Sequence, residues 1–250
     1  MKQIIAAVVL LLCSINCAKA KLPFNNIEES LFDSRIGLVD EFIKRFNANR
    51  PATDSIEAGL PAIVTLFNIE NFSSENDPLY LTAVEFAGDV LKSGTILSYT
   101  DSLWCAKANC EGTYQGKKVS FTLTLNVEAI DDDMYKWSIH EASGDIFKLT
   151  PTAKGYGFKI MPDDHETNFM SLHEITTVQE SCITNYAAKG VTIDPTTVFF
   201  TMVYDGRLKI DHVSSLNFIF DQVPGWSFTV RKFERESSNS GWLIDSLIKR

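Results

Sequence analysis

The sequence predicts an α+β fold in which N-terminal helices pack on a curved antiparallel sheet, with further helix-plus-antiparallel-strand elements in the second half. Apolar residues recur at helical spacing near the N-terminus and then alternate with polar residues over long segments rich in Thr, Val, Tyr and Phe. Helical and strand-like segments do not alternate singly along the chain, as parallel β-α-β units require. The sheet is therefore expected to be antiparallel.

Three helices are expected before the first strand. The first covers Ile27–Phe46, where apolar residues repeat with a helical period and charged residues such as Asp40 and Lys44 fill the other face. A second helix, over Ser55–Asn68, is weakened by an internal glycine and proline. The third covers Leu79–Lys92, with a proline in its first turn and a glycine as its stop.

The pattern then changes to that of strands. Alternating residues predict antiparallel strands over 95–107 and 112–130, with a hairpin turn around Gly116. The acidic run Asp131–Asp133 predicts the next turn, and residues 134–142 return as a strand.

After residue 142 we expect more strands and one helix, over 172–190. Pro195 should precede a strand, and Asp205-Gly206 is typical of a two-residue hairpin turn. The tail from Asn239 fits a short helix or an edge strand. The strands expected in this part cover 144–150, 156–161, 197–204, 207–220 and 226–236.

Residues 1–20 are typical of a signal peptide. A lysine is followed by an apolar run of twelve residues, and Ala18–Ala20 supplies small residues for cleavage. The run is shorter than the ~20 apolar residues of a membrane-spanning helix, so no transmembrane span is expected. The mature chain would contain a cone-like unit over 21–150. A helix-plus-hairpin unit over 151–250 would be either separate from the first core or continuous with it.

Lipid anchoring at Cys17 is the alternative to simple export. Lipoprotein signals place a small residue directly before the modified cysteine, whereas Asn16 precedes Cys17. We therefore prefer simple export to a periplasmic or extracellular location.

The charge of the chain is acidic, with a formal net charge of −9. Loss of Lys2 and Lys19 with the signal peptide brings it to −11. Nonspecific nucleic-acid binding depends on a basic footprint, and the longest basic clusters are pairs such as Lys117-Lys118. Nucleic acid is therefore not expected as a partner.

Three cysteines remain in the mature chain. Cys105 and Cys110 could close a small loop within a hairpin in an oxidising compartment, or stay as two free thiols on neighbouring strands. Cys182 lies in an apolar-periodic stretch and reads as a small buried hydrophobic residue.

Two resemblances accompany these patterns. The stretch "RIGLVDEFIKRFN", followed by two helices and long antiparallel strands, resembles the nuclear-transport-factor-two-like (cystatin-type) cone, in which helices pack into a bent sheet. Enzymes on that fold place an Asp, His or Tyr in the cavity, and no position of this chain aligns with such a residue. The phrases "HETNFMSL", "VPGWSF" and "NSGWLI" are similar to exported bacterial proteins to which no activity is attached, so no functional residue carries over.

The stretch "MPDDHETNFMSLHE" is rich in residues that bind metals or transfer protons. His165 and His173 are eight residues apart, which places them ~26 Å apart on a strand and about two turns apart on a helix. Neither spacing lets both bind one zinc ion. The surviving candidates are Asp163, His165 and Glu166, which would form a ligand-binding site in a turn only with a distant residue. The alternative is a solvated acidic turn.

Trp226 is the remaining binding candidate, because an exposed tryptophan stacks on sugars and other flat ligands; packing in the core is the alternative. The chain has no G-x-S-x-G, phosphate-loop or dinucleotide-binding motif. We therefore assign no catalytic residue, cofactor or metal.

The leading hypothesis is an exported, non-enzymatic protein that binds a small molecule, a glycan or another protein. A cavity enzyme using acid–base residues and a structural subunit of a surface assembly are the alternatives.

Overall fold

The structure, a computed structural model, describes residues 39–48, 61–131, 134–148, 191–237 and 239–250, together with residues 170, 173 and 188. The described chain divides into two compact units. The first contains the residues up to Gly94 together with Arg235–Leu243, and the second contains Thr95–Glu234 together with Ile244–Arg250.

The first unit is built from helices α2 (Val39–Ala48) and α4 (Pro78–Ser93) and the short 3₁₀ helix η2 (Ile69–Asn71). Helix α2 corresponds to the C-terminal half of the first expected helix, and the rest of that helix lies outside the described residues. Aromatic side chains form the core of this unit, with ring centroids about 6 Å apart. They are Phe42, Phe46, Phe67 and Phe86, all of which are buried.

Helix α4 begins and ends where the sequence predicts. Asp77 is its N-cap, and its side chain accepts a hydrogen bond from the Leu79 amide; Pro78 follows in the first turn. Gly94 ends the helix with φ 63°, a left-handed conformation that glycine adopts without steric cost. The second expected helix ends earlier than predicted, because helical structure stops at residue 64 and a turn follows, while residues 55–60 lie outside the described residues.

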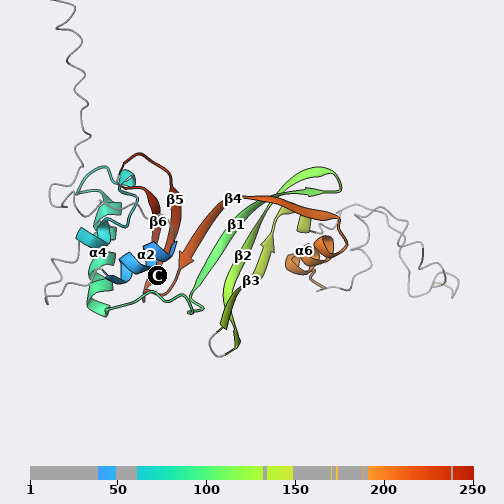
Figure 1. The fold of residues 1–250 in the computed structure, drawn as a ribbon, viewed down its shortest axis with the longest axis horizontal. Coiled ribbons are helices and arrows are strands. Elements are labelled where there is room, and N and C mark those ends of the chain that lie inside the picture. Colours follow the sequence, from blue (N-terminus) through green and yellow to red (C-terminus); the bar gives the residue numbers. More distant parts are fainter. Residues whose placement is uncertain are drawn as a thin grey trace, which may run out of the picture. The chain divides into compact units, whose positions relative to one another are not determined.

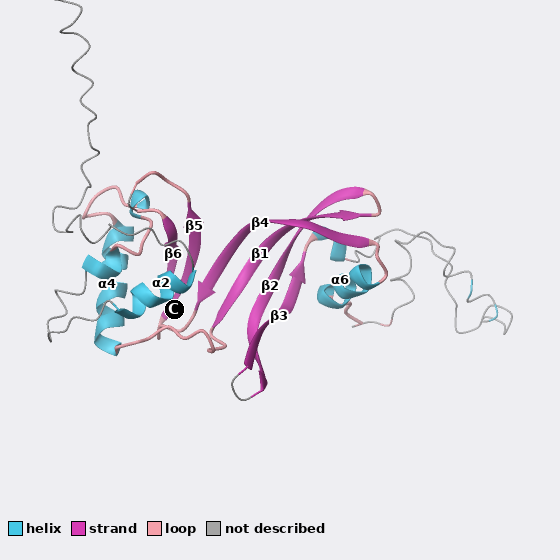
Figure 2. Cartoon of the chain, viewed as in Figure 1, coloured by secondary structure: helices cyan, strands magenta, loops and turns pink. Residues whose placement is uncertain are grey.

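The second unit contains five strands and most of a sixth, which together form an antiparallel sheet (Figures 1 and 2). The strands lie in the order β3-β2-β1-β4-β5-β6. Their bounds are Trp104–Tyr114 for β1, Lys117–Asp131 for β2, Met134–Ser143 for β3, Leu208–Phe220 for β4, Trp226–Phe233 for β5 and Gly241–Lys249 for β6. The prediction of an antiparallel sheet is confirmed, and the tail is an edge strand rather than a helix.

The β1–β2 hairpin has the turn that the sequence predicts around Gly116. Gln115 and Gly116 both have positive φ, 47° and 80°, as a two-residue turn of type I′ requires. The turn fixes the register of the two strands, which pairs Glu111 with Ser120 and Asn109 with Thr122.

The two faces of the sheet differ sharply in polarity. Even-numbered residues of β1, from Trp104 to Cys110, are buried, and those from Ala106 to Cys110 lie opposite apolar residues of β2. The odd-numbered residues point to the other face, which is half-exposed and carries mostly hydroxyl, amide and charged groups. We call this second surface the polar face; its members on β1 and β2 include Lys107, Asn109, Glu111, Thr113, Lys118, Ser120, Thr122, Thr124 and Asn126.

Residues 195–204 correct a prediction, since they form helix α6 (Pro195–Tyr204) rather than a strand. Composition misled here, because Thr, Val and Phe are typical of strands. The capping residues decided the outcome: Asp194 accepts hydrogen bonds from the Thr196 and Thr197 amides, and Pro195 occupies the first turn. The helix then lies against β3 and β4, where Phe199 and Met202 are buried (Figure 1).

Asp205-Gly206 is accordingly the end of helix α6 and not a hairpin turn. The Asp205 amide donates to the Thr201 carbonyl oxygen at 3.1 Å, and Gly206 has φ 75°. Left-handed glycines serve both as hairpin residues and as helix stops, so the dipeptide alone did not distinguish them.

A second correction concerns residues 144–150. Asp145–Phe147 forms a 3₁₀ helix, η3, instead of continuing a strand. Phe147 is buried against Phe121 and Phe199, with centroid distances of 5.5 and 5.8 Å. Burial of this one ring turns the chain away from the sheet after β3. The strand and helix expected over 156–161 and 172–190 lie outside the continuously described segments.

Of the two alternatives for Cys105 and Cys110, the disulfide is not formed, since both are free thiols. Both lie on the same strand, β1, so they are about 16 Å apart at ~3.3 Å per residue. A disulfide requires α-carbons within ~7 Å. Their odd separation also places them on opposite faces of the sheet. Burial raises the pKa of both thiols, which makes them poor nucleophiles at neutral pH.

Asp194 gives helix α6 a pH-dependent cap. Hydrogen bonds from the Thr197 hydroxyl and from the Thr197 and Thr196 amides hold the pKa of Asp194 below its ordinary value. A lowered folded-state pKa means that the cap stabilises the fold above the unfolded pKa, about 3.9, and loses this effect as pH falls through the folded value. Asp194→Asn keeps an acceptor but cannot titrate. We expect the difference in unfolding free energy between the wild type and Asp194→Asn to shrink from pH 6 to pH 3, as measured by urea denaturation. A difference that stays constant would contradict this assignment.

Candidate functional site

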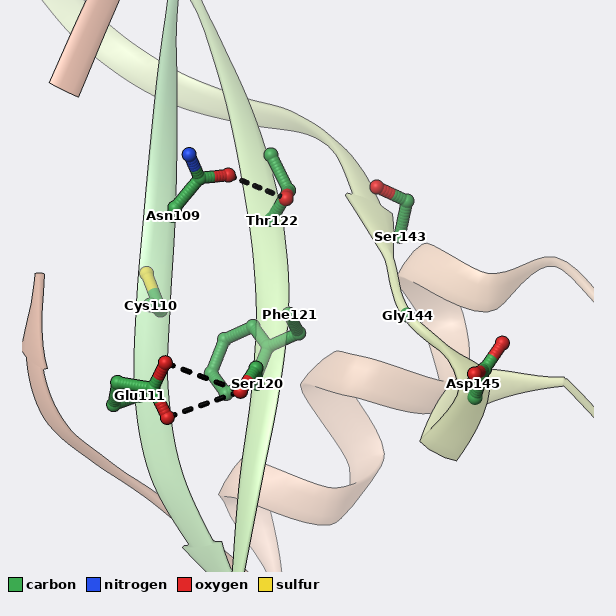
Figure 3. A pocket seen from close by; sticks show the side chains of 9 residues that line it. All are labelled: Asn109, Cys110, Glu111, Ser120, Phe121, Thr122, Ser143, Gly144 and Asp145. Carbon is green, nitrogen blue, oxygen red and sulfur yellow. Dashed lines mark hydrogen bonds between the residues drawn. The ribbon is translucent and has the colours of Figure 1, made fainter. Parts of the chain in front are cut away.

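The candidate site is an open hollow of about 400 Å³ in the second unit. It lies where strands β1 and β2 run beside the chain that leaves β3 (Figure 3). Its polar walls come from Asn109 and Glu111 on β1, Ser120 and Thr122 on β2, and Ser143 and Asp145 at the end of β3.

Cross-strand hydrogen bonds hold the polar groups of the hollow in place. The Ser120 hydroxyl donates to the Glu111 carboxylate, 3.0 Å from Oε2 and 3.1 Å from Oε1. The Thr122 hydroxyl donates to Asn109 Oδ1 at 2.8 Å, and Asn109 Nδ2 donates to Ser215 Oγ on β4 at 2.7 Å. The side chains are therefore positioned before any ligand arrives, which lowers the entropy lost on binding.

Two carboxylates, Glu111 and Asp145, make the hollow acidic. The hydrogen bond from Lys148 Nζ at 2.8 Å and the charge of that ammonium hold the pKa of Asp145 below its ordinary value. Asp145 therefore carries its charge at neutral pH. Because the Asp145 side chain is 95% exposed, its carboxylate remains open to a ligand.

The floor of the hollow is rigid because the residues that form it also belong to the apolar core. Cys110 and Phe121 line it and are buried among Leu123, Ala142 and Phe199. Gly144 allows the third wall to come this close: a Cβ there would lie 2.9 Å from Cβ of Phe121. Close packing of this kind resists the displacement of single side chains, so the geometry of the hollow follows that of the sheet.

The polar groups of the hollow do not include a histidine or an assembled nucleophile–base pair. Ser120 is hydrogen-bonded to a carboxylate rather than to a histidine, and no histidine lines the hollow. His140 and His212 lie exposed on β3 and β4. A nucleophile–base–orienter arrangement is not assembled by these groups. Within the described ranges, no three His, Cys, Asp or Glu side chains gather closely enough to hold a metal ion.

The sequence-predicted site residues lie elsewhere. Asp163, His165 and Glu166 are outside the described residues. Trp226 begins β5 and is 2% exposed, and the Lys249 ammonium lies 5.4 Å from its ring centroid. In this conformation the Trp226 ring is part of the core and its face is covered by Lys249.

The residues of the hollow were missed although the sequence contained a usable pattern. The hairpin turn at Gln115-Gly116 implies that residues equally far from it pair across the strands. Applied to "NCEGT" and "SFT", that rule places Asn109, Glu111, Ser120 and Thr122 on one face of the hairpin. The third wall had no such pattern, because it depends on the 3₁₀ turn after β3.

No helix in the described part of the chain is long and apolar enough to cross a membrane. Comparisons with protein-family models, with curated proteins and with solved structures gave no match.

Proposed function

We propose that this chain is an exported, non-enzymatic binding protein whose hollow on the polar face takes a ligand rich in hydroxyl and ammonium groups, such as an amino-bearing glycan. The observation that carries the proposal is the prepositioned acidic and hydroxyl lining of Glu111, Ser120, Asn109, Thr122 and Asp145. The signal-peptide pattern of residues 1–20 supports export.

The class of ligand follows from the donors and acceptors. Ionised carboxylates accept hydrogen bonds but donate none, whereas serine and threonine hydroxyls and the asparagine amide both donate and accept. Sugar hydroxyls match the second group, and an ammonium group matches Glu111 and Asp145. A sulfated or phosphorylated ligand would meet the negative charge of Glu111, beside an Asp145 carboxylate that is paired with Lys148, and is disfavoured.

Glu111 provides the sharpest test, because it is central to the hollow and easily made neutral. Glu111→Gln keeps the size of the side chain and an acceptor for Ser120, and it removes only the charge. We expect amino-bearing oligosaccharides to raise the melting temperature of the wild type, since a ligand that binds the native state stabilises it. We expect Glu111→Gln to weaken their binding about tenfold or more, as loss of a charge-assisted hydrogen bond does.

Glu128→Gln is the matched control. Glu128 lies on the neighbouring strand β2, is exposed and pairs with Lys136 at 3.5 Å, and it does not line the hollow. Titration calorimetry should give the control the affinity of the wild type. Equal losses for the two variants would show that general acidity, and not this hollow, attracts the ligand. Preferential binding of sulfated oligosaccharides would contradict the proposed ligand class.

A further inference from the structure

Strand β4 presents an open edge over residues 209–216. On one side it pairs with β1 along its whole length, from Leu208 to Phe220. On the other side its pairing with β5 begins only at Asn217. All eight residues from Lys209 to Leu216 are exposed, and in the described chain no strand pairs with this side. An unpaired edge of this length is a template for another strand.

Charged side chains often protect such edges from pairing with another strand, but Asp211 does not protect this edge. Its carboxylate accepts hydrogen bonds from the Thr113 hydroxyl at 2.8 Å and from Lys118 Nζ at 2.7 Å. Both donors lie on the polar face of the protein's own sheet, so the charge of Asp211 is turned back over that face. The apolar side chains Ile210 and Val213 remain on the edge, 43% and 52% exposed.

The order of side chains along this edge is set by two β-bulges. Ser214 and Asp211 are the extra residues, so Val213 lies opposite Cys110 and Ile210 opposite Gly112. Cys110 and Gly112 belong to the apolar side of β1, which places Ile210 and Val213 on the same face. His212 is paired with Glu111 and therefore lies on the polar face.

We infer that the 209–216 edge binds a second copy of this chain, antiparallel and about a two-fold axis, so that two sheets join into one. Centred between Asp211 and His212, the segment is complementary to itself. Ile210 of one copy faces Val213 of the other on the apolar side, and Asp211 faces His212 on the polar side, each twice. A shift by one residue in either direction instead places Asp211 against Asp211 or against Val213. Like charges directly opposite one another are destabilising in a sheet, and two-fold contacts of this self-complementary kind are the commonest in oligomers.

A second register also brings apolar residues together and must be distinguished. With Val213 on the two-fold axis, Val213 faces itself and Ile210 faces Leu216, which is also on the apolar side. That register pairs Asp211 with Ser215 and His212 with Ser214, so it does not bring the Asp211 carboxylate opposite the His212 imidazole. The register centred between Asp211 and His212 is therefore preferred.

Charge substitutions test both the dimer and its register. We expect sedimentation of the purified full chain to show a monomer–dimer equilibrium over about a hundredfold range of concentration. Ile210→Lys should weaken the dimer about tenfold or more, because it sets a lysine against Val213. The double variant Ile210→Lys/Val213→Glu should restore it, since each lysine then faces a glutamate.

The folding of the variants is measured separately from their association. Circular dichroism should show all three variants folded, as expected for exposed positions. A wild type that stays monomeric over the whole range overturns the inference, as does an Ile210→Lys variant that dimerises like the wild type. Rescue by Ile210→Lys/Leu216→Glu in place of Ile210→Lys/Val213→Glu overturns the register. The hollow's ligand takes no part in this experiment, so failure of the proposed function leaves its outcome unchanged.

Discussion

Gly112→Ala is expected to destabilise the chain by about 3 kcal/mol, as overpacking of a well-packed site does. A Cβ at this position would lie 2.5 Å from the Lys209 carbonyl oxygen and 3.0 Å from Cε1 of Phe121. The first of these atoms belongs to the backbone of the neighbouring strand, so the clash is relieved only by moving β4 away from β1. The bulge between the partners of Glu111 and Gly112 accounts for this close approach.

Gly88→Ala is the matched control for this substitution. Gly88 lies in the interior of helix α4, and beyond the nearby backbone of that helix no atom lies within 4 Å of a Cβ built there. Alanine in a helix interior is favoured over glycine by roughly 0.5–1 kcal/mol, so we expect this variant to be slightly stabilised. Urea denaturation followed by circular dichroism measures both. A Gly112→Ala variant with the wild-type midpoint would show that β1 and β4 are not packed as described.

Asn239→Ala is expected to cost about 2–4 kcal/mol of the stability of the first unit, since it leaves buried backbone groups without partners. Asn239 is 4% exposed. Its Oδ1 accepts from the Ile69 amide at 3.2 Å, and its Nδ2 donates to the Phe67 carbonyl oxygen at 2.9 Å. One side chain thus satisfies two backbone groups about 170 residues away in sequence, where the chain enters the 3₁₀ helix η2.

Arg235 strengthens the same junction. Its guanidinium donates to Asn68 Oδ1 at 2.7 Å and lies 3.2 Å from Glu70 Oε1. These contacts remain in Asn239→Ala, so the fold of the unit should survive the substitution.

Asn76→Ala is the control for Asn239→Ala. Asn76 belongs to the same unit and is exposed in the loop before helix α4, and surface substitutions of this kind stay within about 0.5 kcal/mol. Hydrogen exchange of the Ile69 amide provides a local measurement: it should accelerate in Asn239→Ala and remain slow in Asn76→Ala. Unchanged protection of Ile69 would contradict the role assigned to Asn239.

The parts of the fold that the sequence predicted are those governed by neighbouring residues. Helix α4 is delimited by Asp77, Pro78 and Gly94, and the β1–β2 hairpin by Gln115-Gly116. In helix α6 two local signals conflict, because strand-forming residues follow a helix cap at Asp194. Packing of Phe199 and Met202 on the sheet then favours the helix, and no local pattern contains that contact.

The same division applies to the candidate site. Two walls of the hollow follow from hairpin register, which local residues determine. The third wall depends on the burial of Phe147 against Phe121. The hydrogen bonds of Asn239 in the first unit likewise depend on contacts between distant segments. The histidines and carboxylates of "MPDDHETNFMSLHE" are close to one another in sequence, which does not by itself bring them together in the fold. Pairing across neighbouring strands, as between Glu111 and Ser120, indicates the site better than closeness in sequence does.

The central claim is that the ligand binds in the hollow on the polar face, and backbone amide NMR tests it most directly. Titration with an amino-bearing oligosaccharide should shift the amide signals of Asn109–Glu111, Ser120–Thr122 and Ser143–Asp145 together, with one affinity. The same titration of Glu111→Gln should require about tenfold more ligand to reach the same shifts. Shifts concentrated around Trp226 or over 163–166, with the residues of the hollow unmoved, would contradict the claim.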